Sequence, residues 1–210
     1  MTRAIVLYGV ASAMLSVSPP SRASGTESGG DTADGLKRII VRHYATLVHA
    51  TYDDALVGAR KLGSEVETFL TKLSESGLKR VRQAWVDARR PYLQTEACRF
   101  YDGPIDAVEG FINAWPIDEN LIDYVADDAR AGIINEPEKY PAITAELITA
   151  LNEQRGERSI TTGFHAIEFL LWGQDQSVNG PGSRSANDDV NGDNATRRRT
   201  YLRVARRQAG

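Results

Sequence analysis

Cysteine and histidine are scarce in this sequence. Its 210 residues include one cysteine and three histidines. Cys98 has no partner for an intramolecular disulfide, so the fold must be held by its core, and we expect Cys98 to be a small buried residue. With three histidines, a zinc centre built on several imidazole ligands has few residues to draw on.

An excess of basic charge and long apolar runs are also missing. Lys and Arg total 25 against 28 Asp and Glu, which gives a formal net charge of −3. This mildly acidic balance argues against nucleic acid as a partner. Beyond the first residues, no segment is apolar for long enough to span a bilayer. What is present, 41% hydrophobic and 25% charged residues, is typical of one globular domain.

The N-terminus has the pattern of an export signal. An apolar run from Ala4 to Val17 follows Arg3, and Ser21-Arg22-Ala23 fits a small-x-small cleavage site. We therefore expect a signal peptide over 1–23 and a flexible linker over 24–34. The mature chain is expected to be exported, without a transmembrane segment.

Apolar periodicity predicts an all-α fold. From Asp31 or Thr32 to Leu73, apolar residues recur every three or four positions, which indicates one long amphipathic helix. A second helix is expected after Ser74–Gly77, with apolar markers from Leu78 to Phe100, and Pro91 should kink or divide it. Helices joined by a short turn form an antiparallel pair. We predict an up-down four-helix bundle over 35–175.

The remaining segments complete this bundle. Proline and glycine between Tyr101 and Pro141 predict a long connection carrying short helices. Main helices are expected over 142–151 and around Gly163–Trp172, the latter capped by Ser159 or Thr161. Residues 176–196 are rich in Asn, Gly, Asp and Ser and read as a loop. Residues 197–210 begin a basic amphipathic helix and end abruptly, as a truncated helix would.

His165 and Glu168 are the strongest candidates for chemistry. They are three residues apart in an otherwise apolar helix, so they share one face. A buried glutamate needs a counter-charge, hydrogen bonds or a metal. An imidazole and a carboxylate on adjacent turns form half of an iron or zinc site. Glu96 is the best-placed acidic companion, with Asp106 and Asp102 as weaker candidates.

Three functions remain open on this pattern. Hydrolytic zinc motifs require a second nearby histidine, and Phe169 stands where the inverted motif places it, so metal binding is favoured over catalysis. The first alternative is a metallopeptidase in which the same side chains hold a metal that activates water. The second is a structural domain in which His165 and Glu168 bond only to each other and to an arginine.

Several segments together resemble the imelysin family. Gly163-Phe164-His165-Ala166-Ile167-Glu168 resembles its G-x-H-x-x-E signature. The supporting segments are Trp85 to Glu96, Gly103-Pro104-Ile105-Asp106, Asn113-Ala114-Trp115-Pro116-Ile117-Asp118, Ile122-Asp123-Tyr124 and Gly132-Ile133-Ile134-Asn135. They occur in family order and cover roughly residues 36 to 205.

The resemblance implies two packed four-helix bundles, of which this chain carries the first, exported to the bacterial periplasm or cell envelope. It also implies a role in iron uptake or an iron-regulated function, in a family classed as metallopeptidases. Carried over by position, the metal ligands are His165, Glu168 and Glu96, with supporting roles for Arg89, which would orient Glu96, and Asp106. The partners implied are a metal ion and an envelope iron-uptake system.

Overall fold

The computed structural model describes residues 29–99 and 101–207. The expected signal peptide, 1–23, and the start of the expected linker lie outside these residues, whereas residues 29–34 are helical. The described residues form helices and no strand, with one isolated bridge between Val125 and Asp128. The all-α prediction is therefore confirmed for them, and the up-down bundle topology stays a prediction. The chain divides between Ile40 and Val41 into two units.

Helix α1 (Gly29–Thr71) is the long amphipathic helix that the periodicity predicts. Its Leu36 and Ile39, in the first unit, are exposed to solvent. Farther along, in the second unit, Leu62, Val66 and Phe69 are almost fully buried. The C-terminal part of the helix therefore contributes to the core of the second unit.

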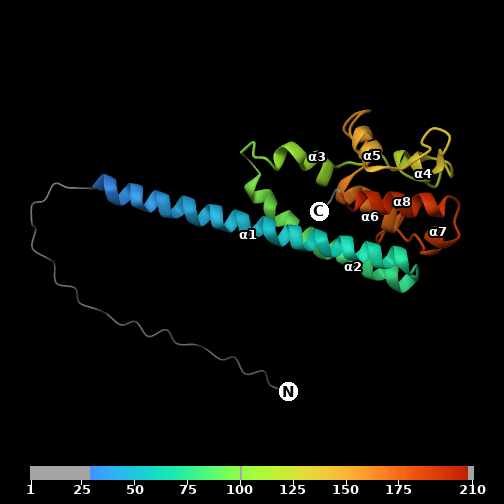
Figure 1. Ribbon diagram of the computed structural model, residues 1–210, viewed down its shortest axis with the longest axis horizontal. Helices are drawn as coiled ribbons and strands as arrows, with labels where there is room; N and C mark the ends of the chain where they lie inside the picture. Colours follow the sequence, from blue (N-terminus) through green and yellow to red (C-terminus); the bar gives the residue numbers. More distant parts are fainter. Residues whose placement is uncertain (1–28, 100, 208–210) are drawn as a thin grey trace, which may run out of the picture. The chain divides into compact units, whose positions relative to one another are not determined.

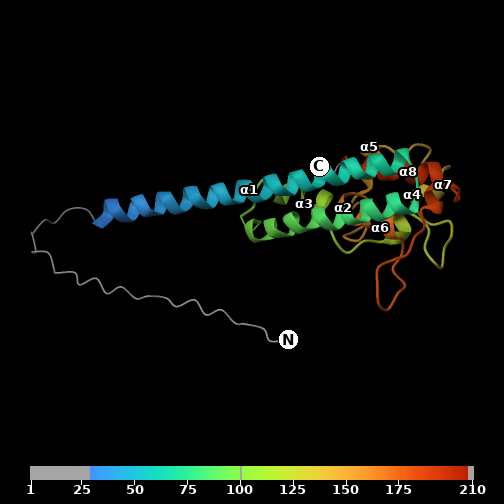
Figure 2. The same cartoon turned by 90° about the horizontal axis from the view of Figure 1, so that it is seen from below.

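Helix α2 (Glu75–Gln94) runs antiparallel to this part of α1. Its N-cap Ser74 accepts a hydrogen bond from the Gly77 amide at 3.1 Å, which satisfies one of the amides left free at a helix start. At the other end, Gly58 of α1 lies so close to α2 that a Cβ there would be 3.1 Å from the Ala88 Cα. Figures 1 and 2 both show α1 and α2 side by side in this region.

The end of α2 departs from the sequence prediction. The helix continues through Pro91, so the proline does not divide it, but it ends at Gln94. A 3₁₀ turn, η1 (Thr95–Cys98), follows, and the buried Thr95 hydroxyl donates to the Tyr92 carbonyl at 2.7 Å. This bond satisfies a carbonyl at the helix end and fits the tighter geometry. Cys98, expected to be buried, is half-buried here.

Short elements fill the connection to the next main helices, as predicted. They are η2 (Asp106–Val108), α3 (Glu109–Ile112), η3 (Glu119–Leu121) and α4 (Gly132–Asn135). Helix α5 (Ala145–Leu151) begins three residues after the predicted start, where Thr144 accepts a hydrogen bond from the Leu147 amide. The connection nevertheless contributes to the core, since Ile122, Ile133 and Ile134 are fully buried.

Helices α6 (Gly163–Trp172), α7 (Asn187–Val190) and α8 (Ala195–Ala205) complete the fold. Helix α6 packs against both α2 and α8. The predicted caps of α6, Ser159 and Thr161, are wrong because both hydroxyls bond elsewhere, to the carbonyls of Gly156 and Ile148. Helix α7 lies inside the stretch expected as a loop.

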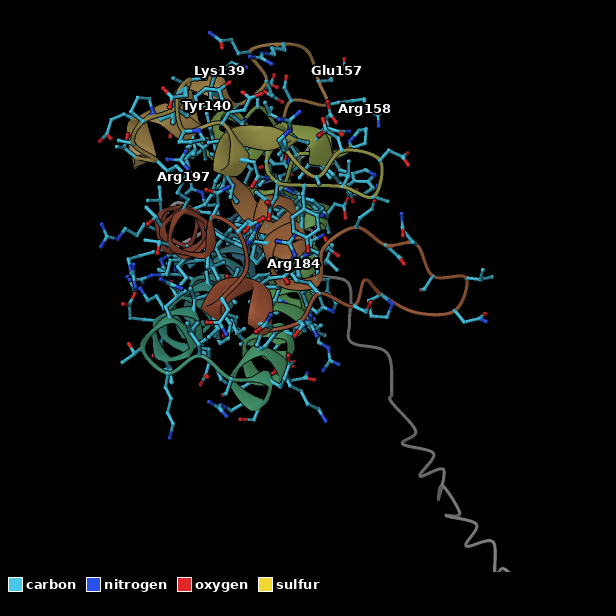
Figure 3. All side chains as sticks on the ribbon, turned by 90° about the vertical axis from the view of Figure 1, so that its right-hand side faces the viewer. Lys139, Tyr140, Glu157, Arg158, Arg184 and Arg197 are labelled. Carbon is cyan, nitrogen blue, oxygen red and sulfur yellow. The ribbon has the colours of Figure 1, made fainter. Side chains whose placement is uncertain are left out.

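A buried ionic network anchors the C-terminal elements. The carboxylate of Asp123, with no exposed surface, accepts hydrogen bonds from Arg184 at 2.7 Å and from Arg198 at 2.6 and 2.9 Å. Figure 3 shows Arg184 among the helices, whereas Lys139 and Arg158 lie at the edge. The network joins the segment after η3 to the segments on both sides of α7. None of the described helices has the length and hydropathy required to cross a membrane.

Candidate metal-binding site

Gly163 sets the position of the motif helix. Its φ of +78° lies in the left-handed region, and a Cβ there would be 2.3 Å from the Ile112 carbonyl oxygen. A side chain at this position would therefore be strained and would collide with backbone. Thr162, just before it, donates from its hydroxyl to the Phe111 carbonyl at 2.9 Å. The start of α6 is thus fixed against the end of α3.

His165 and Glu168 form a direct pair on α6. The imidazole Nδ1 and the carboxylate Oε2 are 2.8 Å apart. The exposed fraction is 13% for the His165 side chain and 40% for Glu168, while their neighbours Ala166, Ile167 and Phe169 are buried. The prediction that the helix is buried on most sides, with this pair on one face, is confirmed.

Two side chains of α2 hold α6 in place. The Trp85 indole Nε1 donates to the Phe164 carbonyl at 2.8 Å, beside the motif. Arg82 donates to the Leu171 carbonyl through Nε and Nη2 at 3.0 and 2.7 Å, near the C-terminus of α6. A cation at this end of a helix is favourable because the last carbonyls are unpaired and carry partial negative charge. These bonds fix α6 along its length and in rotation.

A cavity of about 370 Å³ opens onto the His165–Glu168 pair. All three tryptophans of the chain line it: Trp85, Trp115 and Trp172. The Trp115 ring lies 4.9 Å from the His165 ring, centroid to centroid, and Trp85 meets Trp172 edge to face at 5.4 Å. The imidazole therefore lies between its carboxylate partner and an aromatic wall.

Glu119 and Asp175 bring two more carboxylates to the cavity. Burial raises the pKa of Glu119 above its usual value, and the negative charge of Asp175 acts in the same direction. A hydrogen bond with Gln174 opposes these effects. The cavity wall thus contains three carboxylates and one imidazole, and among the described residues that line it there is no lysine or arginine.

Glu96 lies elsewhere. It is exposed on η1, and it is not among the residues that line the cavity. Arg89, predicted to orient it, instead donates to the Asn113 side chain and packs over the Phe164 ring at 5.2 Å. Burial lowers the pKa of Arg89, and the charge of Glu168 is the strongest influence that opposes this. Arg89 therefore interacts electrostatically with Glu168, within the motif.

Asp106 has a local role. Its Oδ2 accepts a hydrogen bond from the Gly103 amide at 2.7 Å and closes a turn before η2. Across the described residues, no three side chains of His, Cys, Asp or Glu converge closely enough to hold a metal ion. His165 and Glu168 are thus brought together, whereas Glu96 and Asp106 do not join them in such a group.

Sequence reasoning missed most of the cavity wall. Trp115 was noticed only within a family segment, although an exposed tryptophan beside a proline in a polar connection is itself a signal for a binding surface. Its exposed fraction is 66%. Glu119 gave no signal, because only the fold brings it close to His165. Asp175 lies just beyond the end of α6, but no pattern distinguishes it from other acidic residues.

A known protein family matches most of the chain. The family model for imelysin, named peptidase M75, matches residues 48–208, which is more than half of the chain. The chain belongs to the imelysin family. The match includes α6 with its His165–Glu168 pair and every residue that lines the cavity. A comparison with curated proteins finds no match.

Proposed function

We propose that this imelysin-family chain binds a transition metal ion, iron or zinc with iron favoured, through His165 and Glu168. The observation that carries the proposal is the 2.8 Å pair of an imidazole and a carboxylate in a cavity with two further carboxylates. Imidazole nitrogen and carboxylate oxygen are ligands that both iron and zinc accept. The ion is the cargo, and we place the protein in iron uptake or another iron-regulated function of the bacterial envelope.

The described donors fit such an ion in part. His165 and Glu168 supply one nitrogen and one carboxylate, and the direct bond between them would open when both turn to the metal. Glu119 and Asp175 line the same cavity and add negative charge that favours a cation. Other positions around the ion would be taken by water, since no third ligand converges among the described residues.

Titration with ferrous, ferric and zinc ions tests this proposal. We expect His165→Ala and Glu168→Ala each to weaken binding by at least about tenfold, because each removes a direct ligand. The matched control is His49→Ala: His49 pairs with Asp53 at 2.9 Å on the exposed surface of α1 and should leave affinity unchanged. Equal affinity in the parent protein and both motif variants would refute metal binding at this pair.

Two further measurements sharpen the result. Glu96→Ala should change the affinity by less than about twofold, since the side chain is exposed outside the cavity wall. A loss as large as that of His165→Ala would restore the predicted third ligand. Cleavage of a denatured protein substrate that a chelator abolishes would instead support the metallopeptidase alternative.

A further inference from the structure

The wall of the cavity combines aromatic rings with negative charge. Trp85, Trp115 and Trp172 supply large flat surfaces, and Glu119, Glu168 and Asp175 supply carboxylates. Ligand cavities of a few hundred cubic ångströms with apolar walls and a few polar groups commonly bind small organic molecules. A volume of about 370 Å³ lies in this range and greatly exceeds the space that a single metal ion occupies.

The cations near these rings are committed to other partners. Arg82 lies over the Trp172 ring at 5.5 Å, but its nitrogens donate to the carbonyls of Leu171 and Arg184. Arg89 lies over the Trp85 ring at 5.7 Å and donates to Asn113. Neither arginine lines the cavity. Each of these two rings therefore already packs against an arginine. Among the described residues that line the cavity, by contrast, there is no lysine or arginine.

The carboxylates of the cavity are incompletely neutralised. Glu168 is paired with His165 and interacts with the charge of Arg89, whereas Glu119 is held by Gln174, a neutral side chain. Glu119 and Asp175 line the same cavity, and the charge of Asp175 acts to raise the pKa of Glu119, which the weaker effect of the Arg184 charge opposes. The two carboxylates therefore repel each other. A positive ligand placed between them would remove this repulsion, whereas an anion would add to it.

We propose that the cavity binds a small organic cation, an ammonium group on a hydrocarbon body. The ammonium would lie beside Glu119 and Asp175, and the hydrocarbon would pack against the tryptophans. Attraction between a cation and an aromatic face adds to the charge pairing, and tryptophan is the strongest aromatic partner. This function goes beyond metal binding and does not require a metal.

Tryptophan fluorescence of the full chain in excess chelator provides the test. The probes are 3-phenylpropylammonium, the neutral 3-phenyl-1-propanol and the anionic 3-phenylpropanoate, which differ mainly in charge. Because all three tryptophans line the cavity, binding should change the emission directly. We expect saturable binding of the ammonium, with the alcohol weaker by at least about tenfold and the carboxylate weaker still. Equal affinities for the ammonium and the alcohol would overturn the proposal.

Substitutions in the cavity wall test where the ammonium lies. Glu119→Gln and Asp175→Asn should each weaken the ammonium by several-fold and leave the alcohol unchanged, while Trp115→Ala should weaken both. Glu157→Gln is the matched control, since Glu157 is exposed away from the cavity wall. If neither Glu119→Gln nor Asp175→Asn changes the affinity for the ammonium, the assignment fails.

A last binding measurement distinguishes a small amine from a lysine side chain of a peptide as the ligand. Nα-acetyl-lysine methylamide carries the same ammonium on a peptide backbone. Tighter binding of this capped lysine than of 3-phenylpropylammonium would overturn the small-molecule assignment. The chelator keeps this test apart from the metal titration, so either function can fail while the other stands.

Discussion

Single residues determine whether the His165–Glu168 pair is in place. His165 reaches the cavity because α6 starts at a glycine that no other residue can replace without strain. Trp85 and Arg82 then fix the helix by bonds to the Phe164 and Leu171 carbonyls. The pair is therefore positioned by backbone contacts that do not involve its own side chains.

Gly163→Ala tests this dependence. A Cβ at 2.3 Å from the Ile112 oxygen forces the backbone apart, and the positive φ adds strain. We expect the free energy of unfolding to fall by about 2–4 kcal/mol, measured by urea denaturation. Gly156→Ala is the control: its φ is also positive, at +119°, but a Cβ there meets nothing within 4 Å. Equal losses would show that strain alone, without the collision, determines the effect.

Among the elements, α7 contains a titrating group with an unusual environment. Asp189 is buried, its Oδ1 has no hydrogen-bond partner among the described residues, and burial raises its pKa to about 6. Nearby Arg198 and Arg184 oppose this shift without cancelling it. Because the folded-state pKa is raised, the stability linked to Asp189 is complete below about pH 4 and is lost as the pH rises through about 6.

Asp189→Asn should remove this pH dependence. The stability of the variant relative to the parent should rise between pH 4 and pH 8, by at most about 3 kcal/mol for a shift of about two pKa units. Thermal unfolding across this pH range measures the difference. Asp127→Asn, at an exposed position, should show no such trend. A difference that is constant with pH would contradict the raised pKa.

The helices also show how far sequence reasoning reaches. Apolar spacing located α1, most of α2, α5 and α6, because burial on one face leaves a repeat of three and four residues. The same spacing extended α2 too far, since the hydroxyl of Thr95, which bonds the Tyr92 carbonyl, has no effect on periodicity. That error placed Glu96 on a core-facing helix, when in fact it is exposed on η1.

Long-range polar contacts could not be predicted at all. Asp123 is 61 residues from Arg184 and 75 from Arg198. It stands in a family segment, but no local pattern indicates which arginines it would pair with. The His165–Glu168 pair was found because three residues in a helix fix its geometry. The cavity around the pair was not predicted, since its wall combines α6 with residues of α2, η3, the connection before η3 and the segment after α6.

The fold as a whole depends on the Asp123 network. Burial alone would raise the pKa of Asp123, but the hydrogen bond from Arg198 and the charge of Arg184 outweigh it and hold the pKa below its usual range. The folded-state pKa is lowered, so the stability that this carboxylate contributes is present above about pH 4 and is lost as the pH falls further. Without it, Arg198 would lose its ionic partner among the described residues, and Arg184 would keep only the 3.6 Å contact with the Asp188 carboxylate.

Asp123→Ala should therefore be severely destabilising. We expect a loss of about 3–5 kcal/mol in the free energy of unfolding, measured by chemical denaturation at neutral pH. The matched control is Asp127→Ala, an exposed aspartate four residues along, which should change stability by less than about 0.5 kcal/mol. A small effect of Asp123→Ala would mean that water or a neighbouring acid replaces the lost carboxylate.

The segment 173–183 has both of its ends fastened. The Arg184 amide donates to the Trp172 carbonyl at 2.9 Å, and Gly182 lies so close to that carbonyl that a Cβ would be 2.5 Å away. Between them, Val178 is 96% exposed. Lengthening a loop whose ends are already joined costs little, about 0.6 kcal/mol for a doubling. An affinity tag or a fluorophore-bearing peptide can therefore be grafted beside Val178 at little cost in stability, giving a handle for immobilisation.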